Sequence, residues 1–286
     1  MSQSVQNTNA KPGTAMNGKD QKGMKAGANA EDSIFLKMRA AASSLLLPLL
    51  TFVILFVVWE LAVRLLDVKT IILPAPSYIF AELFGSFSFY LPHIRITFYE
   101  AIMGFLLGTI LALFGGVLMS QSRLLERMLL PLAVLANVTP IVVIAPLFMI
   151  WFGFGSYPKI LISAICTFFP MLINSITGFR SVDENNYEYM RSLHASKLEI
   201  FFKLRLPNSL PYLFAAARTC MSMCVIGAVV GEMYGSTKGL GNVVSQSANY
   251  LEMDRMFSAI ILLAAMGILL TNAVRLLERR LLSWHR

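Results

Sequence analysis

Five long stretches of the sequence contain no charged residue, and they strongly limit how the chain can fold. They are Ala40–Trp59, Ala101–Ser122, Met128–Pro158, Ile160–Phe179 and Met256–Val274. About 20 apolar residues in a helix are enough to cross the hydrocarbon core of a bilayer. Backbone groups inside lipid must find their hydrogen bonds within the protein, so a helix is the expected conformation of each stretch.

The composition agrees with a membrane protein. The chain has 286 residues, of which 56% are hydrophobic and 14% charged, and a soluble chain of this length needs more charge to cover its surface. A further span must run through Arg218, because the uncharged segment after it is too short alone. We therefore predict an all-α, polytopic transmembrane helical bundle of about six spans in residues 39–286, with spans near 43–65, 97–120, 128–151, 158–179, 210–232 and 256–276.

Lysine and arginine are concentrated in alternate connecting segments. If the N-terminus is cytoplasmic, the outer segments hold only Arg64, Lys69, Arg95, Lys159, Lys238 and Arg255. The positive-inside rule then predicts a multi-pass protein of the cell (inner) membrane, in contact with lipid and with both termini in the cytoplasm. The net charge of +8 is therefore explained by the lysine and arginine residues of the predicted cytoplasmic segments. No nucleic-acid partner is expected, since the basic residues do not gather on a soluble face.

Residues 1–38 are predicted to form a disordered cytoplasmic tail. They are rich in Ala, Gly, Asn, Gln and Lys and contain few large apolar residues, so they cannot bury enough surface to fold. They also lack an apolar core with a cleavage site, which argues against a secretory signal peptide.

The loop at 180–211 is predicted to fold as two short helices joined by a turn. Asp183 is placed to cap the first helix, and Ser196 with Glu199 forms a capping box for the second. Pro207 lacks a backbone N–H, so it marks a break or a new helix start. A loop this regular and this apolar is expected to dock on a partner.

The same loop carries a resemblance to a known family. The run Glu188-Tyr-Met-Arg-Ser-Leu-His-Ala195, followed by Leu206-Pro207, resembles the "EAA" motif of ABC importer permeases. Other segments are similar to the branch that imports nitrate, taurine, alkylsulfonates, thiamine-precursor pyrimidines or riboflavin: 150–155, 169–170, 178–183, 227–232 and 239–241. The resemblance covers roughly residues 45–284.

The resemblance implies a type I ABC importer transmembrane domain that serves as the permease subunit and is not an enzyme. Two such subunits, most simply two copies of this chain, would enclose a pathway, and separate ABC ATPase subunits would bind the ATP. An extracytoplasmic binding protein would deliver a small solute to the outer loops at 73–76 and 235–241. The residues implied in coupling to the ATPase are Glu188, Tyr189, Met190, Leu193, His194, Ala195, Leu206 and Pro207.

The coupling motif departs from the family pattern at three positions. Tyr189 and Met190 stand where the family has two alanines, and His194 stands where it has glycine. That glycine would end the first helix in a left-handed conformation, which histidine tolerates at a cost of about 1 kcal/mol. His194 is therefore interpreted as a tolerated turn residue, with a pH-sensitive contact as the alternative.

The sequence contains no phosphate-binding loop of the Walker type and no catalytic constellation. The nearest segment, Gly235–Gly239, has a glycine after its lysine and lies on the predicted outer side. No cofactor is therefore expected in this chain. Cys166, Cys220 and Cys224 fall within predicted spans, where packing is a better interpretation than a metal site.

Polar residues within the spans are candidates for lining a pathway: Asn137, Thr139, Asn174 and Arg218. Arg218 could instead extend its charge to the cytoplasmic surface or pack against the sister subunit. Glu60, Glu100 and Glu232 fall near predicted helix ends, where we expect them to reach interfacial water. Gly104-x-x-x-Gly108 is expected to permit close helix packing.

Two other function classes make different demands on the sequence. An ion-coupled secondary transporter would need paired carboxylates or broken helices at mid-membrane. A membrane-embedded enzyme would need a cluster of catalytic groups, but His93, His194 and His285 are scattered. No side-chain pattern in the sequence identifies the solute.

Overall fold

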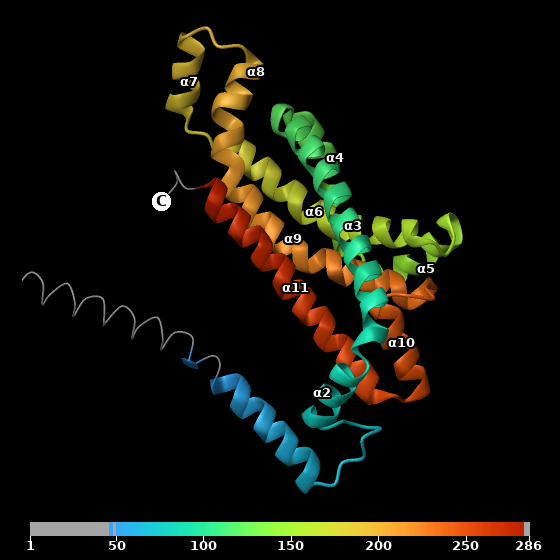
Figure 1. The fold of residues 1–286 in the computed structure, drawn as a ribbon. Helices are drawn as coiled ribbons and strands as arrows, with labels where there is room; N and C mark the ends of the chain where they lie inside the picture. Colours follow the sequence, from blue (N-terminus) through green and yellow to red (C-terminus); the bar gives the residue numbers. More distant parts are fainter. Residues whose placement is uncertain (1–45, 48–49, 283–286) are drawn as a thin grey trace, which may run out of the picture. The chain divides into compact units, whose positions relative to one another are not determined.

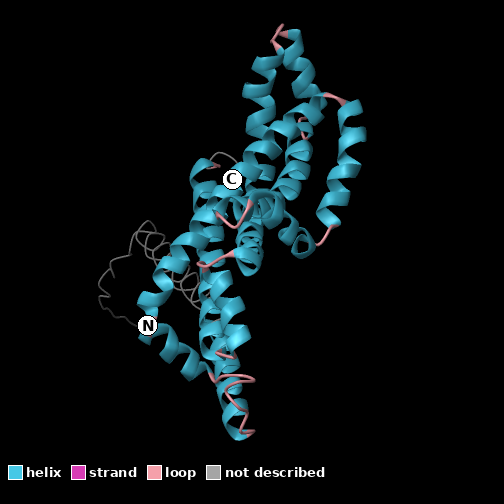
Figure 2. Cartoon of the chain, turned by 90° about the vertical axis from the view of Figure 1, so that its right-hand side faces the viewer, coloured by secondary structure: helices cyan, strands magenta, loops and turns pink. Residues whose placement is uncertain are grey.

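The structure is a computed structural model that describes residues 46–47 and 50–282, and within them every regular element is a helix (Figure 2). The chain divides into two compact units, 1–62 and 63–286. The first holds most of a helix at 50–65, and the tail predicted at 1–38 lies outside the described residues. The elements that follow are α2 (Pro76–Gly85), α3 (Phe87–Gln121), α4 (Arg123–Val138), α5 (Ile141–Phe152), α6 (Ser156–Arg180), α7 (Glu184–Ser192), α8 (Lys197–Ile200), the π-helical turn η1 (Phe201–Arg205), α9 (Leu206–Gly235), α10 (Leu240–Tyr250) and α11 (Met253–Leu281).

Four helical segments of the described residues are long and apolar enough to cross a membrane. They are α3, α6, the continuous helix Lys197–Gly235 and α11, and the bent pair α4–α5 would make a fifth span. The predicted span at 43–65 lies only partly within the described residues, and its described part is helical at 46–47 and 50–65. The all-α transmembrane fold is confirmed.

The prediction of a single continuous helix at 128–151 is wrong. The chain breaks between α4 and α5, whose axes differ by 97°. Thr139 takes an extended conformation (ψ 124°) directly before Pro140. A residue before proline is disfavoured in the helical region, and proline cannot donate a backbone hydrogen bond, so the break falls at this dipeptide.

Small residues let α3, α6 and α9 approach closely. A Cβ atom added at Gly104 would lie 2.3 Å from Ser163 Oγ, and one added at Gly108 would lie 2.4 Å from the carbonyl oxygen of Ala164. On the other side of α6, a Cβ atom at Gly227 would lie 2.6 Å from Ser163 Cα. The predicted close packing through Gly104 and Gly108 is confirmed.

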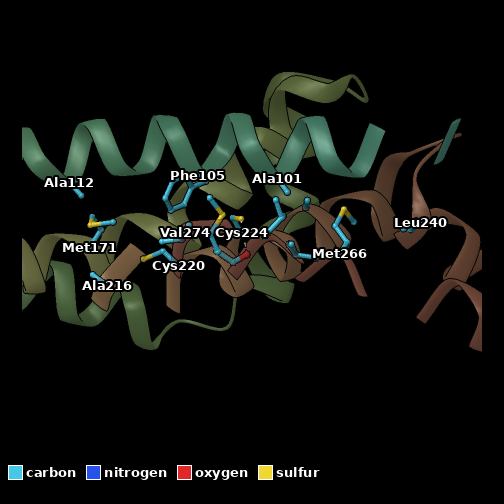
Figure 3. Close-up of a cluster of buried hydrophobic side chains, with 14 of the residues drawn as sticks. Ala101, Phe105, Ala112, Met171, Ala216, Cys220, Cys224, Leu240, Met266 and Val274 are labelled. Carbon is cyan, nitrogen blue, oxygen red and sulfur yellow. Dashed lines mark hydrogen bonds between the residues drawn. The ribbon is translucent and has the colours of Figure 1, made fainter. Parts of the chain in front are cut away.

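The hydrophobic core is formed where these helices meet α11 (Figure 3). Phe105 of α3, Met171 of α6 and Val274 of α11 are buried in it. Cys220 and Cys224 of α9 are fully buried in the same cluster, which confirms that these thiols pack as small apolar groups.

Shorter helices stand at the two ends of this second unit (Figure 1). The hairpin of α7 and α8 lies at one end, and α2 and α10 lie at the other. The sequence interpretation included the hairpin but missed α2 and α10, because each has only 10 or 11 residues and no distinct polar boundary.

Candidate functional site: the helical hairpin and the bundle interior

The first helix of the hairpin begins and ends as the sequence predicts. Asp183 is the N-cap of α7, and its Oδ1 accepts a hydrogen bond from the N–H of Asn185 at 2.8 Å. After the helix, His194 has φ +56°, the left-handed conformation expected where the family has glycine. The N–H of Ala195 then donates to the carbonyl of Met190 at 3.2 Å, which closes the turn.

The second helix begins with the predicted capping box. The N–H of Ser196 donates to Glu199 Oε2 at 2.9 Å, and the N–H of Glu199 donates to Ser196 Oγ at 3.3 Å. Pro207 lies at the start of α9, which agrees with the second of the two predicted alternatives, and the helical path is not broken there. The wider turn of η1 comes immediately before α9 and places Pro207 in its first turn, where the missing N–H costs little. One helix therefore runs from the hairpin to Gly235.

The hairpin presents apolar side chains that no other described residue covers. Tyr189, Leu193, Leu198 and Phe202 are each 60–70% exposed. No residue of α7 is buried. Large apolar side chains grouped on a segment that projects from the bundle indicate an interaction surface.

The predicted coupling residues fall into two groups on this hairpin. Six lie on α7 or in the turn after it: Glu188, Tyr189, Met190, Leu193, His194 and Ala195. Leu206 and Pro207 lie at the base, at the start of α9, and are partly buried. The sequence interpretation missed Leu198 and Phe202, although their spacing of four residues on one helix was a usable signal.

The base of the hairpin is fixed to the bundle by several side chains. Arg180 pairs with Glu126 of α4 and donates to the carbonyl of Met119 at the end of α3. The rings of Phe179 and Phe201 lie 5.5 Å apart between centroids. The base of the hairpin is thus attached to the ends of α3, α4 and α6.

A buried polar network occupies the opposite end of the bundle. Oε1 of Glu232 accepts a hydrogen bond from Thr97 Oγ1 at 2.7 Å, and Oε2 accepts from the N–H of Gly241 at 2.6 Å. The N–H of Leu240 donates to Thr97 Oγ1 at 2.8 Å, and the N–H of Gly239 donates to Nδ1 of His93 at 3.0 Å. These bonds hold the start of α10 against α3 and α9.

Lys159 extends this network to Glu100. Its Nζ lies 3.5 Å from Glu100 Oε1 and donates to Ser236 Oγ at 2.7 Å. Glu100 and Glu232 are fully buried and Lys159 is 4% exposed. The expectation that Glu100 and Glu232 reach interfacial water is therefore wrong: Glu232 accepts hydrogen bonds from α3 and α10, and Glu100 faces the Lys159 ammonium of α6.

The two loops that were expected to face a binding protein are only partly exposed. Pro74, Ala75 and Pro76 are buried, as are Gly239–Gly241, whereas Thr237 and Lys238 are exposed. Of 73–76 and 235–241, the tip of the second loop therefore offers the most exposed surface.

Two of the four predicted pathway residues line a pocket at the break between α4 and α5. The pocket has a volume of about 280 Å³ and contains Asn137 and Thr139. Asn174 does not line it and donates to the carbonyl of Pro170 at 2.8 Å. Arg218 does not line it either, and its Nε lies 3.4 Å from Glu278 Oε2.

Comparisons with known proteins place this geometry in a family. Residues 104–283 match the family described as "Binding-protein-dependent transport system inner membrane component". The putative aliphatic sulfonates permease SsuC of Bacillus subtilis is 35% identical, over 84% of this chain and 86% of its own. The formylaminopyrimidine permease ThiX of Halalkalibacterium halodurans is 31% identical, over 84% and 96%. The riboflavin permease RibX of Chloroflexus aurantiacus is 32% identical, over 82% and 88%.

The fold also resembles a solved structure. A chain of the MetNI methionine ABC transporter in an inward-facing conformation superposes with a TM-score of 0.61 at 18% identity, over 68% of this chain and 97% of that one. At this identity the likeness concerns the fold alone. Together with the family match and the curated relatives, it shows that the chain belongs to the permease components of ABC importers, multi-pass membrane proteins that transport a solute and are not enzymes.

Proposed function

We propose that this chain moves a small solute, received from an extracytoplasmic binding protein, and is driven by a separate ATPase that binds the hairpin. The observation that carries the proposal is the exposed apolar surface of α7 and α8 on a helix that continues into a membrane span. A surface of this kind suits a cleft in a soluble partner, with buried aromatic side chains as the main contributors to binding. Tyr189 and Phe202 are the aromatic side chains that would supply it.

The hairpin would work as a lever. The continuous helix Lys197–Gly235 has 39 residues, which corresponds to a length of roughly 60 Å at 1.5 Å per residue. Closure of the ATPase subunits on ATP would shift the hairpin, and the attachments of Arg180 and Phe201 would pass that shift to the neighbouring spans. Rigid-body motion of this type is a common way to change which side a cavity faces.

The charges support the proposed orientation. Arg123, Arg127, Arg180, Lys203 and Arg205 all lie at the end that carries the hairpin. The positive-inside rule assigns that end to the cytoplasm, which places α2 and α10 on the outer side, where a binding protein would approach. A second copy of the chain would complete the pathway, as closed two-fold assembly is the commonest arrangement of like subunits.

Charge reversal at Glu188 tests the proposal. Glu188 is exposed on α7, so Glu188→Arg should leave folding and membrane insertion intact. We expect it to abolish ATP-dependent uptake and co-purification of the ATPase, and Met190→Pro, which breaks α7, should do the same. The matched control for co-purification of the ATPase is Glu252→Arg, because Glu252 is exposed at the opposite end. Uptake at the normal rate without any ATPase would refute the proposal.

An ion-coupled secondary transporter is not favoured. The structure does contain a broken span and two buried carboxylates, Glu100 and Glu232, which such carriers use. The family match and the relatives named above are nevertheless components of ABC importers, so these features need a different explanation.

A further inference from the structure

Resting on the proposed import function, we propose that the pocket at the α4–α5 break is a solute-binding site within the pathway. We further infer that it accepts an uncharged, single-ring heteroaromatic compound that carries both hydrogen-bond donors and acceptors. Three properties of the pocket support this: its position, its lack of charge and its size.

The position is that of a site inside a pathway. One wall is the break itself, formed by residues 136–141, and the others are side chains near the middle of α6 and α9: Ile165, Cys166, Phe169, Met223 and Ile226. Solute sites of membrane carriers commonly lie at mid-depth beside interrupted helices. Irregular backbone at this depth is tolerated only where protein or a cavity covers it, and the side chain of Asn137 is exposed there. An amide facing lipid would be costly, which indicates a polar neighbour.

The pocket offers no charge to an ionic solute. None of the described residues that line it is acidic or basic. The N-terminus of α5 would attract an anion, but the C-terminus of α4 meets it at the same break. The partial positive charge at the N-terminus of α5 and the partial negative charge at the C-terminus of α4 therefore lie close together, and their effects on an ion in the pocket offset each other. A sulfonate or nitrate would therefore lose its hydration without gaining a countercharge.

The polar groups that are present suit a neutral ring. The Asn137 amide offers two donors and one acceptor, and the unbonded N–H and C=O groups of the two helix ends add more. Thr139 Oγ1 is already donating to the carbonyl of Leu135 at 3.0 Å, so it can still accept. Phe169 and Met223 supply the aromatic and thioether contacts that pack against flat rings.

The size restricts the solute further. The volume of about 280 Å³ lies just below the range of roughly 300–1,000 Å³ that is usual for small-ligand pockets. A single ring with short substituents matches a pocket at the lower edge of this range, which favours such a ring over a three-ring flavin with a side chain. Of the solutes named for the relatives above, a formylaminopyrimidine satisfies both the size and the charge.

Equilibrium binding to the complete transporter tests this inference. The permease–ATPase complex in lipid nanodiscs would be titrated with radiolabelled formylaminopyrimidine, in competition with taurine, ethanesulfonate and riboflavin. We expect only the pyrimidine to bind. Asn137→Leu should weaken its binding about tenfold, which is about 1.4 kcal/mol and matches the loss of a net hydrogen bond. Ile226→Trp, which fills the pocket, should abolish binding.

The control is Ile268→Trp, because Ile268 is an exposed isoleucine of α11 that does not line the pocket. Tighter binding of taurine or ethanesulfonate than of the pyrimidine would overturn the inference. So would pyrimidine binding that Ile226→Trp leaves unchanged, or no binding at all. Co-purification of the ATPase is recorded for each variant. Its loss in the wild type would refute the proposed function, whereas intact ATPase coupling without pyrimidine binding would refute only the solute site.

Discussion

Removal of the Glu232 side chain should destabilise the bundle more than removal of any exposed carboxylate. Glu232 is fully buried and accepts hydrogen bonds from Thr97 Oγ1 and the N–H of Gly241. In Glu232→Ala the hydroxyl of Thr97 can turn to the carbonyl of His93, at 3.1 Å. The Gly241 N–H, in contrast, has no other hydrogen-bond acceptor among the described residues. A hydrogen bond contributes a net of about 0.5–1.5 kcal/mol, and a buried donor left unpaired costs about 1–3 kcal/mol.

The expected loss of unfolding free energy is therefore about 3 kcal/mol, measured by reversible unfolding in mixed micelles. Glu232→Gln keeps an acceptor for Gly241 and should lose about half as much. Hydrogen exchange should rise selectively at the amides of 239–241, because Glu232 and Thr97 hold the start of α10.

Glu252→Ala is the matched control. Glu252 lies at the same end of the bundle, pairs with Arg255 and is 47% exposed, so its removal should cost under about 1 kcal/mol. Equal losses for Glu232→Ala and Glu252→Ala would refute the reasoning that burial gives this network its strength.

Three further predictions concern the packing of the spans and the hairpin. Gly108→Val should prevent accumulation of folded protein, measured by size-exclusion chromatography in detergent, since its Cβ would lie 2.4 Å from the backbone oxygen of Ala164; a normal folded yield would contradict this. Ser196→Ala removes the cap of α8 and should raise hydrogen exchange at 196–200, at a local cost of about 1 kcal/mol; unchanged exchange would show that the cap is dispensable. His194→Gly relieves a positive φ and should stabilise the hairpin by up to about 1 kcal/mol, seen as slower exchange there. If uptake by the wild type depends on pH and uptake by this variant does not, His194 is a pH sensor and not merely a turn residue.

Local sequence signals predicted the hairpin well. Asp183, Ser196 and His194 act on backbone groups within three residues of themselves, so the pattern of residue types is sufficient to place them. Glu100 and Glu232 were misplaced for the opposite reason. Lys159, which faces Glu100, is 59 residues away along the chain, and Thr97, which donates to Glu232, is 135 residues away. Hydropathy alone cannot show which polar residues meet after packing.

The prolines show the same division between local signal and tertiary context. Pro140 and Pro170 both lie in predicted spans, yet only the first ends a helix. α6 is packed between α3 and α9, with half of its apolar window buried, and Asn174 donates to the carbonyl of Pro170. α4 has a single buried residue, Ala133, so few neighbouring contacts oppose the preference of Thr139 for an extended backbone. Pro131 lies inside α4 without interrupting it, so weak packing alone does not decide where the helix ends. The break falls where the Thr139–Pro140 dipeptide coincides with weak packing, and the pocket lies at the same place.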